Sequence, residues 1–157
     1  MLQAWEVVLG SYPGWCAEIW GRHVDGGVEL VVRDRVDFGG ERSWMAFLVR
    51  GIHLADEYLT KDSDWASYGF QQVHPAVTPL DRLTMLRVYT HAAREAQTPA
   101  LRVAAAAQAR ALVPILRADL ASAALDFGFP DHAAAASSLS DAEAELRAAE
   151  AALRPAE

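Results

Sequence analysis

The chain has 157 residues, a formal net charge of −7 and one cysteine, Cys16, and these values limit what it can be. The length suits a single domain with its own core, and one cysteine excludes both an internal disulfide and a zinc site built from several thiols. Because nucleic-acid binding depends largely on neutralising phosphates, the acidic charge makes nucleic acid an unfavourable partner.

Three segments near the N-terminus have the composition of β-strands. Residues 5–9, 16–20 and 28–35 are rich in β-branched and aromatic side chains, and turn-forming residues separate them. We therefore expect a three-stranded antiparallel meander. In the third segment, two sets of residues alternate: Val28, Leu30 and Val32 against Glu29, Val31 and Arg33. This alternation predicts one buried and one partly solvated face of the sheet.

Residues 42–59 follow with a helical period. Their apolar residues recur on one arc of a helix: Trp44, Phe47, Leu48, Gly51, Ile52, Ala55, Tyr58 and Leu59. The pattern predicts a helix that covers the sheet, with Ser43 close to its start. We expect a second, short helix after it, with Ser63 as the N-cap.

The composition changes near residue 78, from an aromatic part to an alanine-rich part. Twelve of the fourteen aromatic residues lie at or before Tyr89, including all five tryptophans. The pair Thr78-Pro79 predicts the start of a helix, because threonine can cap and proline suits the first helical position. This helix is expected to end near residue 96, and a second pair, Thr98-Pro99, is expected to start the next one.

Two further helices are predicted in the alanine-rich part. The first, from about residue 100 to 127, contains Pro114, which removes one backbone hydrogen bond and should kink the helix. Ser140 and Glu143 form a capping-box pattern that predicts the start of the last helix. The alanine run 133–136 before it is expected to be a loop or a fraying turn.

These elements predict an α+β fold. Residues 1–77 are expected to form an aromatic-rich part, in which a small antiparallel sheet of about three strands is packed by a helix. Residues 78–157 are expected to form an alanine-rich helical hairpin or bundle. We expect the two parts to make one compact structural unit.

His53, Asp56 and Glu57 are candidate metal ligands. On the predicted helix 42–59 they lie three and four residues apart, so they could approach one cation, as in a small metal-assisted hydrolase. Arg50 shares their face, and ordinary solvated ion pairing explains the same residues. We favour ion pairing, because the sequence has no catalytic signature. No catalytic residue and no cofactor are therefore assigned.

Charge is strongly segregated along the chain. The segment from Arg82 to Ala118 carries six arginines and one acidic residue, which gives +5, and the remainder carries −12. Five of these arginines form what we call the basic ridge: Arg87, Arg94, Arg102, Arg110 and Arg117. The ridge could contact nucleic-acid phosphates or an acidic partner. It could instead pair within the chain, with Asp56, Glu57, Asp62 and Asp64, or with Asp141, Glu143, Glu145 and Glu150 of the last helix. We favour pairing within the chain or between subunits, because segregated charge in an acidic chain neutralises itself most simply.

Five tryptophans are many for an N-terminal part of this size. Trp15 and Trp65 are candidate exposed anchors for a protein partner, and a core filled by aromatic side chains is the alternative. The sequence thus indicates a non-enzymatic protein-binding or regulatory module, comparable in charge and size to a small acidic inhibitor, immunity or adaptor protein. We expect it to bind a protein, most simply a basic one, and to form homo-oligomers through its C-terminal helices. A cytoplasmic location without membrane association is expected, because no stretch approaches about 18 continuous apolar residues.

Overall fold

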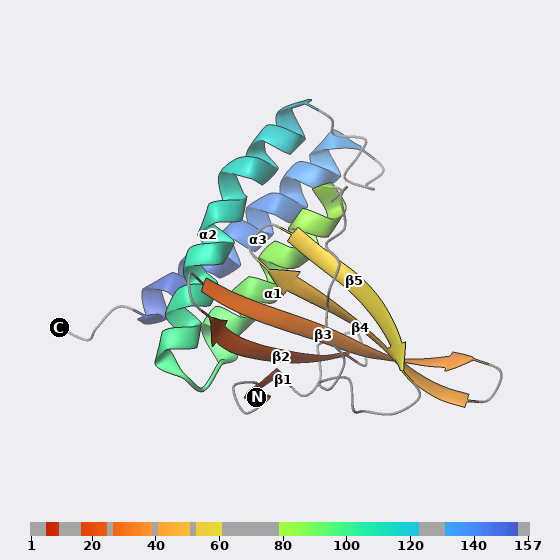
Figure 1. The fold of residues 1–157 in the computed structure, drawn as a ribbon. Coiled ribbons are helices and arrows are strands. Elements are labelled where there is room, and N and C mark those ends of the chain that lie inside the picture. Colours follow the sequence, from red (N-terminus) through yellow and green to blue (C-terminus); the bar gives the residue numbers. More distant parts are fainter. Residues whose placement is uncertain are drawn as a thin grey trace.

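The computed structural model describes residues 6–9, 17–24, 27–38, 41–50, 53–60, 79–122 and 131–153. Within this described part, five strands precede three helices (Figure 1). The strands are β1 (Glu6–Leu9), β2 (Ala17–Val24), β3 (Gly27–Phe38), β4 (Glu41–Arg50) and β5 (His53–Thr60). The helices are α1 (Pro79–Glu95), α2 (Pro99–Ser122) and α3 (His132–Leu153). The fold class is α+β, as predicted.

The strands form one sheet in the order β1-β2-β3-β4-β5, and each strand pairs antiparallel with the next. The three predicted N-terminal strands are confirmed, and β2 and β3 extend beyond their predicted ends. The predicted count of about three strands is wrong, because β4 and β5 continue the same meander. The predicted Ser63 helix lies outside the described residues.

The predicted helix over residues 42–59 is wrong, because this segment supplies β4 and β5. Its aromatic and branched residues favour strands as well as buried helix faces. Ten residues of β3 pair with β4, from Glu29 opposite Arg50 to Phe38 opposite Glu41. This long ladder satisfies the backbone of β4 and overrides the local helical spacing.

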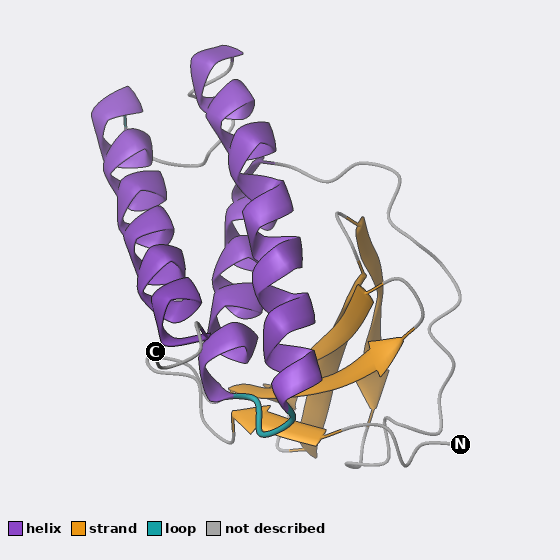
Figure 2. Cartoon of the chain, turned by 90° about the vertical axis from the view of Figure 1, so that its left-hand side faces the viewer, coloured by secondary structure: helices purple, strands orange, loops and turns teal. Residues whose placement is uncertain are grey.

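Both faces of β3 are buried near its start. Val28, Leu30 and Val32 belong to the core that the helices share, as their alternation predicted. The expectation of a partly solvated second face is wrong at Glu29 and Val31, which are also buried. Figure 2 shows that the helices lie on one side of the sheet.

The start of α1 and the start of α2 agree with the predicted Thr-Pro signals. Both helices begin at proline, at Pro79 and Pro99. The carbonyl of Thr98 accepts the backbone N–H of Arg102 at 3.1 Å, which closes the first turn of α2. The helix continues through Pro114 and ends at Ser122. Both helix starts follow from local backbone chemistry.

The last helix begins eight residues before the predicted capping box. The carboxylate of Asp131 accepts the backbone N–H of Ala134 at 2.8 Å, so Asp131 is the N-cap of α3. The alanine run 133–136 is therefore the first part of a helix, and its prediction as a loop is wrong. Alanine has the highest helix propensity, so this run is helical once Asp131 caps its N-terminal end.

The described strands and helices form three layers. α1 and α2 are antiparallel neighbours that pack on β2, with α1 also on β1 and α2 also on β3, and α3 packs on α1 and α2. One hydrophobic cluster joins strands and helices, with Leu30 of β3, Leu86 of α1, Leu112 of α2 and Leu146 of α3 fully buried within it. The helices are thus held on the sheet by a common core.

Candidate functional site

Two arginines of the basic ridge lie along the contact between α2 and α3. Arg110 Nε donates to Glu150 Oε2 at 3.1 Å, and its Nη2 also bonds Glu150 Oε1. Seven residues further along α2, Arg117 Nη2 donates to Glu143 Oε1. Because α2 and α3 run antiparallel, the two ion pairs lie one after the other along the contact between these helices.

The pairing within the chain that the charge segregation favoured is therefore observed for Arg110 and Arg117. The hydrogen bond to Glu150 raises the pKa of Arg110 above its ordinary value, partly opposed by desolvation. Glu143 is buried, and its charge is compensated by Arg117. These cations act as links between two helices of one chain.

Arg102 has a different role, which the sequence did not indicate. Its Nη1 donates to the backbone carbonyl of Ala96 at 2.7 Å and to that of Gln97 at 3.1 Å. The last carbonyls of a helix have no partner inside the helix. Arg102 therefore stabilises the end of α1 and the turn into α2, where a positive charge also suits the helix dipole.

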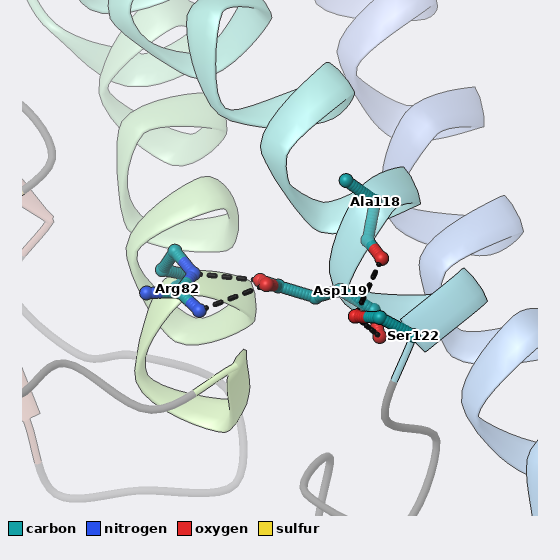
Figure 3. A network of polar contacts seen from close by, with 4 residues as sticks. All are labelled: Arg82, Ala118, Asp119 and Ser122. Carbon is teal, nitrogen blue, oxygen red and sulfur yellow. Dashed lines mark hydrogen bonds and ion pairs between the residues drawn. The ribbon is translucent and has the colours of Figure 1, made fainter.

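Arg82 lies outside the basic ridge but pairs in a similar way. Its Nε donates to Asp119 Oδ2 at 2.7 Å and its Nη2 to Asp119 Oδ1 at 2.9 Å. Figure 3 shows the guanidinium and the carboxylate facing each other between α1 and α2. It also shows Ser122 bonding back to the carbonyls of Ala118 and Asp119 near the end of α2.

The α1 members of the ridge, Arg87 and Arg94, lie on the more exposed side of that helix. Arg94 contacts Glu95 at 3.2 Å and donates to Nδ1 of His91 at 3.0 Å. Burial lowers the pKa of His91, and Arg94 lowers it further, while Glu145 of α3 and Glu95 act in the opposite direction. Four arginines of the ridge therefore have different described partners: Arg94, Arg102, Arg110 and Arg117.

The candidate metal ligands His53, Asp56 and Glu57 lie on β5. A strand rises by about 3.3 Å per residue, so His53 and Glu57 are separated by about 13 Å along it. The helical geometry behind the metal hypothesis is therefore wrong. Among the residues that the structure describes, no three His, Cys, Asp or Glu side chains are grouped so that they could hold a metal ion.

A further charged contact lies on the sheet. Arg22 Nη2 donates to both carboxylate oxygens of Glu29, at 3.3 and 3.4 Å, although Glu29 is only 5% exposed. Directly opposite Glu29 on the other neighbouring strand is Arg50, which in turn pairs with His53. By backbone register these four positions lie in one row across β2, β3, β4 and β5. The candidate anchors Trp15 and Trp65 lie outside the described residues.

The solvent-facing sides of α2 and α3 form a surface that the sequence analysis missed. Seven exposed residues of α2, spaced by three or four, make the α2 outer stripe: Ala100, Val103, Ala107, Ala111, Pro114, Ala118 and Ala121. Six exposed residues of α3 make the α3 outer stripe: Ala133, Ser137, Ser140, Ala144, Ala148 and Ala151. Neither stripe contains a charged residue.

A signal for the α2 outer stripe was present in the sequence. The buried side of α2 includes Leu101, Ala105, Leu112 and Leu116, as predicted. A helix that buries one side is normally polar on the other. The opposite side of α2 is instead apolar along its whole length. This second apolar arc is the sequence signal that could have predicted an exposed apolar surface on α2.

No family model matches this chain, and searches of curated proteins and of solved structures found no match either. None of the three described helices has the length and hydropathy that a membrane span requires. The function therefore has to be inferred from the arrangement of the side chains.

Proposed function

We propose that this chain is a non-enzymatic protein-binding module that self-associates through its C-terminal helices. The observation that carries the proposal is the α2 outer stripe. It extends over the 22 residues of helix from Ala100 to Ala121, about 32 Å from end to end at a rise of 1.5 Å per residue. Val103 within it is 58% exposed. Elongated apolar patches of this kind on a protein surface are typical of interaction sites.

The ion pairs explain why this surface suits an apolar partner. Arg82, Arg110 and Arg117 each bond a carboxylate of the same chain. The charges of these three arginines are thus balanced internally, and the α2 outer stripe itself contains no charged residue. A partner with a similar uncharged helix face fits it, and a second copy of the chain provides one.

The remaining charge favours a basic protein as a further partner. The chain carries −7 in total although the segment from Arg82 to Ala118 is positive. An acidic protein attracts a basic one over long range and accelerates their encounter. Trp15 and Trp65 remain the proposed anchors for such a partner, in the manner of a small inhibitor or immunity protein.

Light scattering coupled to size exclusion tests self-association. The molar mass of the intact protein should rise with concentration from that of one chain towards that of two. Ala111→Glu places a carboxylate in the α2 outer stripe and should lower the association constant by at least about tenfold, or about 1.4 kcal/mol. Gln108→Glu adds the same charge to a half-buried position outside the stripe and is the matched control. A constant single-chain mass at all concentrations would contradict the proposal.

A further inference from the structure

We draw no further inference here: the strongest candidate, the side-chain cluster of His91 and Arg94 on α1 with Glu145 of α3, rests on the lowered pKa of His91 and carries nothing beyond the pH dependence of stability that this shift implies.

Discussion

Arg82 near the start of α1 and Asp119 near the end of α2 form a two-point ion pair between residues 37 positions apart in the sequence. Both side chains are largely buried, and the two N–H···O distances are 2.7 and 2.9 Å. The pair joins the open ends of the antiparallel helices, opposite the short connection between them. The ion pair therefore links α1 and α2 at the end of the hairpin that lies opposite their connecting turn.

Asp119→Asn should lower the free energy of unfolding by about 1–2 kcal/mol. The amide cannot accept both N–H groups of Arg82, and a largely buried guanidinium then loses its counter-charge. Urea denaturation followed by circular dichroism measures the change, with an unaltered slope showing that the denatured state is unaffected. Glu95→Gln removes the partner of the exposed pair Arg94–Glu95 and is the control, with an expected loss below about 0.5 kcal/mol. Equal losses in the two variants would show that the Arg82–Asp119 pair has no special role.

Arg117→Ala should destabilise the protein more than Arg110→Ala. The reason is the burial of the carboxylate left behind, because the side chain of Glu143 is 11% exposed whereas that of Glu150 is 31% exposed. An uncompensated charge is more costly where water cannot reach it. The expected losses are about 2 kcal/mol for Arg117→Ala and below about 1 kcal/mol for Arg110→Ala, measured by urea denaturation.

A double variant tests the same explanation. Arg117→Ala combined with Glu143→Leu removes the buried charge as well as its partner, and should recover most of the stability lost in Arg117→Ala alone. If the double variant is less stable than Arg117→Ala, the cost of that substitution does not come from the stranded carboxylate of Glu143.

His91 should make stability depend on pH. Its pKa in the folded protein is lowered from 6.5, first by burial and then by Arg94, so the unfolded chain takes up this proton more readily. The free energy of unfolding should therefore fall as the pH drops below about 6.5 and level off below the folded-state pKa. Protonation also removes the acceptor for Arg94, while Glu95 and Glu145 partly offset the effect.

The His91→Gln variant isolates this contribution from that of the carboxylates. The difference in stability between the intact protein and His91→Gln, measured by denaturation between about pH 8 and pH 5, should shift in favour of the variant at the acidic end. A difference that does not change with pH would show that His91 titrates alike in both states.

Pro114→Ala should stabilise α2. Proline has no backbone N–H, so the carbonyl of Arg110 four residues earlier lacks its usual helical partner, and Pro114 itself is exposed and fills no part of the core. The expected gain is about 1–3 kcal/mol, measured as a rise in thermal midpoint. Loss of stability in Pro114→Ala would indicate that the bend at proline is needed for packing.

Helix starts were predictable because their signals are local. Pro79 and Pro99 open α1 and α2 where the Thr-Pro pairs placed them. The N-cap Asp131 is an equally local signal, but the prediction placed the start of the last helix at the capping box of Ser140. The strands β4 and β5 could not be found in this way, because their apolar residues fit both periods and the choice was made by pairing with β3, far along the backbone.

The candidate site was predictable in its charges and not in its apolar surface. That Arg110 and Arg117 pair within the chain was favoured by the charge segregation, which a sequence displays directly, whereas the choice of Glu150 and Glu143 as partners was left open. The exposure of each alanine of α2 depends on which parts of that helix are covered by α1, α3 and the sheet. Such coverage is set by tertiary packing and cannot be derived from local sequence. Ala109 and Ala111 are chemically identical, and only the fold buries the first and exposes the second.

A dilution series followed by amide nuclear magnetic resonance tests the central claim, self-association through the outward sides of α2 and α3, most directly. On dilution the amide signals of Ala107, Ala111 and Ala144 should shift together with one common dissociation constant, while those of Leu30 and Val32 in β3 stay in place. Signals that are independent of concentration, or shifts confined to the sheet, would contradict it.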